Sequence, residues 1–145
     1  MLYINCQTKC APKTKADFNR YSELLIKELS LEEKELSVTL CDNEFMQNLN
    51  SKFRDEDKPT DVLSFPMDDE YILGDIIIST EQVKENAKEY GNSFFEELLY
   101  LFVHGLCHLL GHDHDTDLEI KEMSEAEQEM IALYATYGVN INGRI

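Results

Sequence analysis

Residues 93–114 read S-F-F-E-E-L-L-Y-L-F-V-H-G-L-C-H-L-L-G-H-D-H, an apolar run that passes into a group of histidines. Ser93 followed by Glu96 matches a capping box, so a helix is expected to begin here and to continue to about Leu110. Its residues are apolar on almost every side, which predicts that the helix runs through the middle of the fold with other elements packed around it. Burial of this kind gives the rigid, dry support that a metal site needs.

Three histidines in this stretch have the spacing of metal ligands. His104 and His108 are four residues apart, so on a helix they project from one face about one turn apart. Gly111 can end the helix in a left-handed conformation and return His114 as a third ligand. A single histidine on an apolar helix is usually a core residue, but three at this spacing favour a catalytic zinc site with an open fourth position. His112 is expected to be a turn or surface residue.

The same histidines fit the long zincin pattern H-E-x-x-H-x-x-G-x-x-H except at one position. Gly105 stands where a zinc peptidase has the glutamate that deprotonates the zinc-bound water. A peptidase interpretation therefore lacks its general base. Asp113 is expected to anchor a histidine ring, and Cys107 to be a small, buried apolar residue.

The rest of the chain alternates between strand and helix patterns. Strands are expected at residues 2–7, 35–41, 62–67 and 74–79. Besides the helix at Ser93, helices are expected to begin at Pro12, at Asp42 or Asn43, at Ser79 and at Ser124. Helix ends are expected near Arg54 and at the glycines 91, 111 and 138. The pattern predicts an α/β chain of four strands and about five helices.

Length and composition set further limits. The 145 residues fit a single domain, residues 1–145, that is long enough to bury a hydrophobic core. A net charge of −16 argues against non-specific attraction to nucleic acid or anionic lipid, although basic residues are denser in the first sixty positions. Without a signal or membrane-spanning pattern, we expect a cytoplasmic protein whose cysteines, residues 6, 10, 41 and 107, stay reduced.

Two separated motifs stand out: F-R-D-E-D-K-P-T-D-V-L-S-F-P at 53–66 with L-G-D-I at 73–76, and the three-histidine string at 104–114. Together they resemble the YbeY family of bacterial endoribonucleases that process ribosomal RNA. The elements around them follow in the same order, so the resemblance spans nearly the whole chain. Two departures stand outside the ligand positions: Cys107 replaces a usual leucine, and His112 a usual tyrosine.

The resemblance implies a mixed α/β fold with a four-stranded sheet and a metal ion held by His104, His108 and His114. The ion is expected to be Zn²⁺, with Ni²⁺ or Co²⁺ as alternatives. The implied activity is cleavage of single-stranded RNA in ribosomal RNA maturation, with the ribosome or ribosomal proteins as partners and with neither DNA nor membrane. The family's conserved arginine falls on Arg54, which makes Arg54 and His104 the expected catalytic residues and Arg54 the expected substrate-binding residue.

Other interpretations remain open from the residues alone. An arginine at a helix end can hold a phosphate with two parallel hydrogen bonds, but it also suits the helix dipole. Asp61 and Asp75 belong to the first motif, yet an aspartate before a strand is usually structural, so both are left outside the catalytic set. Attack by water and attack by the 2′-hydroxyl are not distinguished. The rival functions are a zincin-like hydrolase of peptides or amides and a non-catalytic, metal-stabilised module associated with the ribosome.

Overall fold

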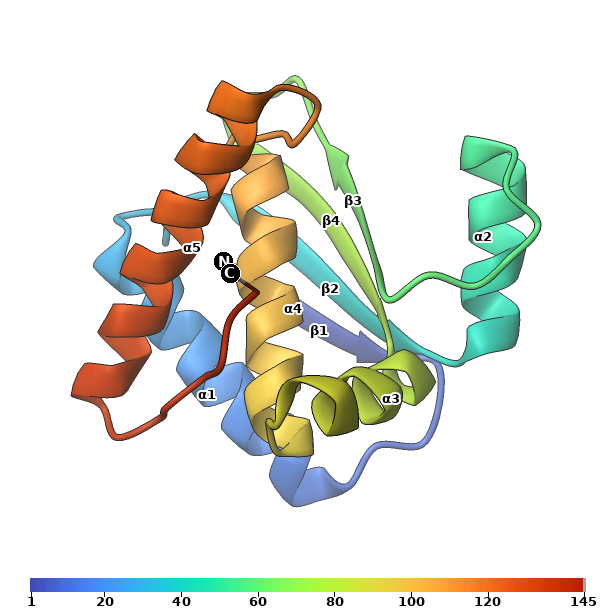
Figure 1. The fold of residues 1–145 in the computed structure, drawn as a ribbon, viewed down its shortest axis with the longest axis horizontal. Coiled ribbons are helices and arrows are strands. Elements are labelled where there is room, and N and C mark those ends of the chain that lie inside the picture. The colour runs from blue at the N-terminus through green and yellow to red at the C-terminus, as the bar shows by residue number, and fades with distance from the viewer. Residues whose placement is uncertain (145) are drawn as a thin grey trace.

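In the computed structural model, which describes residues 1–144, strands and helices alternate up to residue 66, and a fourth strand and three consecutive helices follow (Figure 1). The strands are β1 (Leu2–Cys6), β2 (Glu35–Cys41), β3 (Val62–Pro66) and β4 (Ile72–Ser79). The helices are α1 (Pro12–Glu28), α2 (Asn43–Arg54), α3 (Thr80–Tyr90), α4 (Phe94–Leu109) and α5 (Asp117–Thr136). The predicted fold class is confirmed, and most expected bounds lie within two residues of the observed ones.

The four strands form one mixed sheet in the order β1-β2-β4-β3. β1 pairs with β2 and β2 with β4 in parallel, whereas β3 pairs with β4 in the antiparallel direction. Helix α1 connects the parallel strands β1 and β2, as parallel pairs require. Because β3 lies at the end of this order, one of its edges is free of strand partners within the described sheet.

Helix α4 lies at the centre of the fold (Figure 1). It packs against β3 and β4 and also contacts α1, α3 and α5. Its apolar residues are almost fully buried, and Phe102 meets Phe18 of α1 edge to face with ring centroids 5.7 Å apart. Cys107 is also fully buried, as predicted, and burial raises the pKa of its thiol to about 12. The central, buried helix expected from the sequence is therefore present.

The two faces of the sheet have separate apolar clusters because successive strand residues point to opposite faces. Ile76 and Ile78 of β4 belong to the large core around α4, whereas Ile77 belongs to a smaller cluster with Leu63 and Met46. Met46 comes from α2, which lies apart from the other helices in Figure 1. Helix α2 therefore covers the face of the sheet opposite α4.

Gly105 allows α4 to approach the sheet closely. A Cβ atom at this position would lie 2.9 Å from Cγ2 of Ile76 and 3.1 Å from Oγ of Ser64. The Ser64 hydroxyl donates a hydrogen bond of 3.0 Å to the Gly105 carbonyl oxygen. Packing therefore requires a glycine at this position. The space that a glutamate side chain would need, as in a zincin, is occupied by residues of the sheet.

The predicted start of the last helix is wrong. α5 begins at Asp117, with Thr116 as its N-cap accepting a hydrogen bond from the Glu119 amide at 3.1 Å. Ser124 lies inside this helix instead of capping it. Thr116 and Glu119 repeat the Ser/Thr-x-x-Glu pattern earlier in the chain, so the first of two competing caps starts the helix. Among residues 1–144, no helix is both long and apolar enough to cross a membrane.

We expect Gly105→Glu to lower the free energy of unfolding by about 3 kcal/mol or more, because a carboxylate would be forced into a filled apolar contact. Chemical denaturation measures the change. Leu110→Glu is the matched control, since Leu110 follows the same helix and is 40% exposed. Wild-type stability of Gly105→Glu would contradict this account of the packing.

Candidate metal centre

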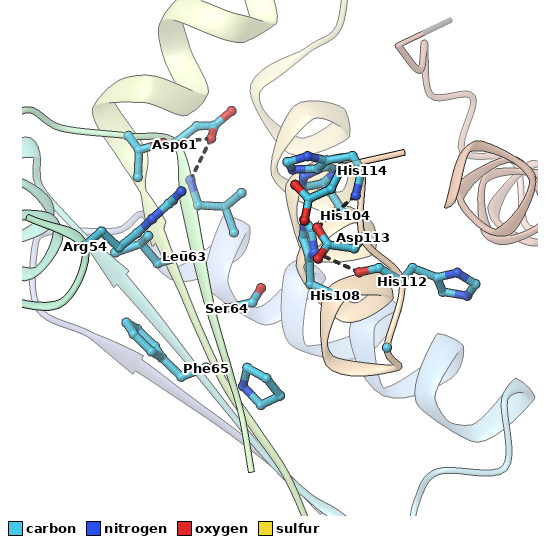
Figure 2. A pocket seen from close by; sticks show the side chains of 15 residues that line it. Arg54, Asp61, Leu63, Ser64, Phe65, His104, His108, His112, Asp113 and His114 are labelled. Atoms are coloured by element: carbon cyan, nitrogen blue, oxygen red, sulfur yellow. Dashed lines mark hydrogen bonds between the residues drawn. The ribbon is translucent and has the colours of Figure 1, made fainter. Parts of the chain in front are cut away.

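Three histidines converge at the C-terminal end of α4 (Figure 2). The ring centroids of His104 and His108 are 4.9 Å apart on one face of the helix. Gly111 then adopts a φ of +97°, a left-handed conformation that suits glycine, and the chain turns back. This turn brings the His114 ring to 5.2 Å from the His108 ring. One ring nitrogen from each histidine lies within 4.8 Å of the other two, so the predicted cluster is formed.

The chemistry of this cluster fits a divalent metal ion. His104 and His108 are half-buried and His114 is exposed, so an ion held here would face both the protein and the solvent. Three imidazole nitrogens with an open position form the usual ligand set of a catalytic zinc ion. Metal binding by these residues remains a prediction, and their arrangement is the one that the prediction requires.

A backbone acceptor orients the His108 ring. Its Nδ1 lies 3.0 Å from the carbonyl oxygen of His112, and an Nδ1–H donating to that oxygen leaves Nε2 as the ligand atom. Burial, followed by the neighbouring His104, lowers the pKa of His108. At neutral pH the ring is therefore neutral, which is the form that binds metal. The ring of His112 itself points away from the cluster (Figure 2), as its predicted turn role requires.

Asp113 makes a different contact from the one expected of it. Its carboxylate accepts a hydrogen bond of 2.8 Å from the backbone amide of His114, and this bond lowers the pKa of Asp113. Among the described contacts, the ring nitrogens are instead met by the His112 carbonyl and by Glu127. The Asp113 carboxylate bonds to the nearby backbone amide instead of to a histidine ring, because aspartate readily accepts hydrogen bonds from neighbouring amides.

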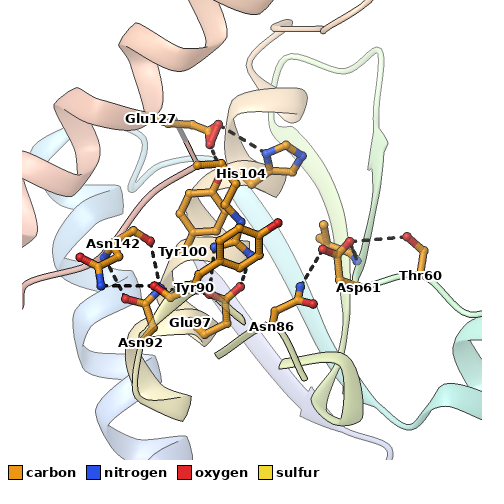
Figure 3. A network of polar contacts seen from close by, with 12 residues as sticks. Thr60, Asp61, Asn86, Tyr90, Asn92, Glu97, Tyr100, His104, Glu127 and Asn142 are labelled. Atoms are coloured by element: carbon orange, nitrogen blue, oxygen red, sulfur yellow. Dashed lines mark hydrogen bonds and ion pairs between the residues drawn. The ribbon is translucent and has the colours of Figure 1, made fainter. Parts of the chain in front are cut away.

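Glu127 of α5 orients the His104 ring (Figure 3). Its Oε2 lies 3.5 Å from Nδ1 of His104, and its Oε1 accepts a hydrogen bond from the Tyr100 hydroxyl. Both Glu127 and Tyr100 are buried. A buried carboxylate beside Nδ1 favours a proton on that nitrogen and leaves Nε2 free for a metal ion. The sequence predicts no contact between Glu127 and His104, because 23 residues separate them and no local pattern joins them.

The C-terminal segment fixes Tyr100 in turn. The guanidinium of Arg144 stacks on Tyr90 and Tyr100, with Cζ 3.5 Å and 4.0 Å from the two ring centroids. The same guanidinium makes two hydrogen bonds to Glu97, a side chain with no exposed surface. Figure 3 shows the tyrosines between Glu97 and Glu127. The contacts therefore run without a break from Arg144 through Tyr100 and Glu127 to His104.

The histidines line a cavity of about 680 Å³ whose other wall is formed by β3 and the end of α2. Arg54 is the last residue of α2 and lines the same cavity. The helix stops there because Asp55 adopts a left-handed φ of 54° and its amide bonds to the Asn50 carbonyl. In Figure 2, Arg54 lies on one side of β3 and the histidines on the other. The fold thus joins the two motifs that the sequence keeps apart.

Asp61 also lines this cavity, but its contacts are structural. Its Oδ1 accepts a hydrogen bond of 2.8 Å from the Val62 amide, and its Oδ2 accepts one of 3.0 Å from the Asn86 side chain. Both carboxylate oxygens are therefore engaged: Oδ1 bonds to the first residue of β3, and Oδ2 bonds to α3. The exclusion of Asp61 from the catalytic set stays a prediction.

We expect His104→Ala, His108→Ala and His114→Ala each to lose the bound metal ion, because each removes one of three ligands. Elemental analysis of protein purified in the presence of zinc measures the loss. His112→Ala is a matched control, since it keeps the carbonyl oxygen that orients His108. Full metal content in His114→Ala, or loss only in His112→Ala, would mean that the ligand set is wrong.

We also expect Glu127→Gln to lower metal affinity roughly 10- to 100-fold, as is typical when the hydrogen-bond partner of a ligating histidine is changed. Competition with a chromophoric chelator measures the dissociation constant. Glu129→Gln is the control, because Glu129 is an exposed residue of the same helix. Equal affinity in Glu127→Gln and wild-type protein would show that the carboxylate does not orient His104.

Comparisons with known proteins show the family to which the chain belongs. The sequence profile of the family described as Endoribonuclease YbeY matches residues 3–135. An Endoribonuclease YbeY of Carboxydothermus hydrogenoformans is 49% identical over 100 residues, covering 67% of this chain and 70% of the relative. Another, from Sulfurihydrogenibium, is 43% identical over 123 residues and covers 81% of both chains. The solution structure of TM1509 from Thermotoga maritima superposes with a TM-score of 0.63 at 29% identity, over 94% of this chain and 93% of that one. The chain belongs to the YbeY family of endoribonucleases.

Proposed function

We propose that this protein is a zinc-dependent endoribonuclease that cuts single-stranded RNA during ribosomal RNA maturation in the cytoplasm. The observation that carries the proposal is that Arg54 and the three histidines line one cavity. Membership of an endoribonuclease family supports RNA as the substrate class. The preference for single strands, the ribosomal substrate and the association with the ribosome or its proteins are part of the proposal.

Zinc is the metal that we propose for the cluster, with nickel or cobalt as alternatives, because three imidazoles suit all of these ions. When bound, the ion supplies Lewis acidity at the scissile phosphate and lowers the pKa of water. The chain's part is to hold His104 and His108 in fixed orientations through Glu127 and the His112 carbonyl. Ligands that are already oriented need little rearrangement during the reaction.

Arg54 is the group that we propose to hold the phosphate. A guanidinium donates two parallel hydrogen bonds to phosphate oxygens and keeps its charge at any relevant pH. Within residues 1–144, no carboxylate lies within ion-pairing distance of Arg54, and its side chain is exposed. The guanidinium is therefore free to meet a phosphate at the wall of the cavity opposite the histidines.

Two rival functions fit the structure less well. A zincin-like peptide or amide hydrolase needs a general base after the first histidine, and that position is occupied by Gly105, packed against Ile76 and Ser64. A non-catalytic, metal-stabilised module needs no open cavity beside the metal ligands and no unpaired arginine in its wall. Both features of the cavity therefore favour an enzyme acting on an anionic substrate.

Arg54→Ala should lose roughly 10²- to 10³-fold in the rate of RNA cleavage, because a donor aimed at developing negative charge contributes that much. Arg54→Lys should also be impaired, since an ammonium cannot make the two parallel bonds. Metal content should not change, and stability should fall by less than about 1 kcal/mol, as for an exposed residue. Initial rates on an unstructured RNA oligonucleotide measure the effect.

The control is Arg20→Ala, which removes an exposed arginine of α1 outside the cavity. Wild-type cleavage by Arg54→Ala would reject the phosphate role. The same metal-loaded protein should be offered single-stranded RNA, duplex RNA and casein. Cleavage of casein alone would favour the hydrolase of peptides, and unfolding on chelation without any cleavage would favour the non-catalytic module.

A further inference from the structure

Phe53 is a large aromatic residue that the fold leaves exposed beside the metal cavity. It lies in the last turn of α2, next to Arg54, and 57% of its surface is exposed. Phe45 and Leu49 precede it at intervals of four residues, so the three share one face of the helix. Phe45 and Leu49 pack against the cluster under α2, whereas Phe53 extends past the end of that cluster.

The Phe53 ring has two neighbours, the ring of Phe65 and the flexible side chain of Lys52. Its centroid lies 5.5 Å from that of Phe65, with the ring planes inclined at 67°. The Lys52 ammonium lies 5.4 Å from the Phe53 centroid. Phe65 itself lines the cavity of the histidines, together with Arg54. An edge-to-face contact holds the Phe53 ring in place while much of its surface remains in contact with solvent.

The position of the Phe53 ring relative to the three histidines follows from the geometry of β3. Ser64 bonds to α4, on the side of the histidines, while its strand neighbours Leu63 and Phe65 point to the opposite face under α2. β3 is an edge strand, so the cavity extends around its free edge from one face to the other. A chain lying across this edge can meet the metal ligands on one side and the two phenylalanines on the other.

We propose that Phe53, supported by Phe65, is a stacking site for one nucleobase of a single-stranded RNA substrate. The inference rests on the proposed function, because it assigns a place to a nucleotide near the phosphate that Arg54 holds. Every base has a flat aromatic face, and stacking on an exposed aromatic side chain is a common way to bind single-stranded RNA. A base in a duplex is already stacked on both sides, so the site favours single strands.

The charge of the protein supports stacking as a source of affinity. With a net charge of −16, the chain as a whole repels a polyanion. Close to the ring, the cations Lys52 and Arg54 are followed by the acidic residues Asp55, Glu56 and Asp57, so no strongly basic surface is formed here. A contact with the neutral face of a base adds affinity that this charge does not oppose.

The test compares the kinetics of Phe53→Ala, Phe53→Leu and Phe53→Tyr in metal-loaded protein on an unstructured RNA oligonucleotide. Stacking on one base predicts that KM rises roughly 5- to 100-fold in Phe53→Ala. kcat should stay near the wild-type value, because stacking away from the reacting atoms stabilises ground and transition states equally. Phe53→Tyr should restore the wild-type KM, and Phe53→Leu, which is apolar but not aromatic, should not.

A second set of substrates carries one abasic nucleotide, moved along the oligonucleotide. At the position whose base stacks on Phe53, the missing base should raise the KM of the wild-type protein. On that same substrate, the KM of Phe53→Ala should be no higher than that of the wild-type protein. Tyr71→Ala is the matched control, because Tyr71 is an aromatic residue with 69% exposure in the connection between β3 and β4, where neither of its chain neighbours lines the cavity. Its KM should not change. Melting temperatures of all variants distinguish lost binding from lost folding.

Wild-type KM in Phe53→Ala would overturn the stacking site while leaving the proposed endoribonuclease intact. A wild-type KM in Phe53→Leu would also overturn it, because apolar contact would then be sufficient. If the effects of Phe53→Ala and of the abasic nucleotide are independent at every position, no base stacks on this ring. If the wild-type protein cuts no RNA at all, the proposed function itself is wrong.

Discussion

Burial of α4 on almost every side is the constraint on which the rest of the structure depends. A helix in the middle of a core can carry polar side chains only where other elements bring partners to them, because an unpaired buried charge or hydroxyl is costly. Glu97 is paired with Arg144, and Tyr100 with Glu127. Glu127 also contacts His104. The partners come from α5 and from the C-terminal segment, so the packing of both segments on α4 and the orientation of the His104 ring depend on the same contacts.

The position of the cavity follows from the way α4 meets the sheet. Gly105 lets the helix lie close to β4 at Ile76 and close to β3 at Ser64, in the turn of helix that carries the histidines. This contact sets the three histidines beside an edge strand, and Arg54 lines the same cavity from the other side of that strand. A larger residue at 105 would move the helix away from the strand. Gly105, which stands where a zinc peptidase has its general base, therefore also allows the histidine motif to lie close to the motif that contains Arg54.

The sequence predicted the features that depend on short-range patterns. The helix and strand periods, the Ser93 cap, the Gly111 turn and the grouping of the three histidines all follow from spacings of two to seven residues. It could not predict the contacts that join distant segments. Glu127 lies 23 residues from His104, and Arg144 lies 47 residues from Glu97. No local pattern marks such pairs, because the packing of whole helices brings them together. The wrong prediction of a cap at Ser124 has a local cause, because Thr116 and Ser124 both begin the same Ser/Thr-x-x-Glu pattern.

The acidity of the chain limits how it can recognise RNA under the proposed function. Non-specific binding to a polyanion draws on many basic contacts, each of which releases counterions. This protein has 13 basic residues against 29 acidic ones, so long-range attraction works against capture of the substrate. Affinity must then come from a few local contacts that outweigh this repulsion: a metal ion on the histidines, a two-bond contact from Arg54, and the face of a base on Phe53. Such contacts require an exposed, unpaired strand that can bend around the free edge of β3. Repulsion between the acidic protein and RNA leaves binding dependent on these local contacts. RNA segments that are already single-stranded can make them, so such segments are favoured over duplex RNA.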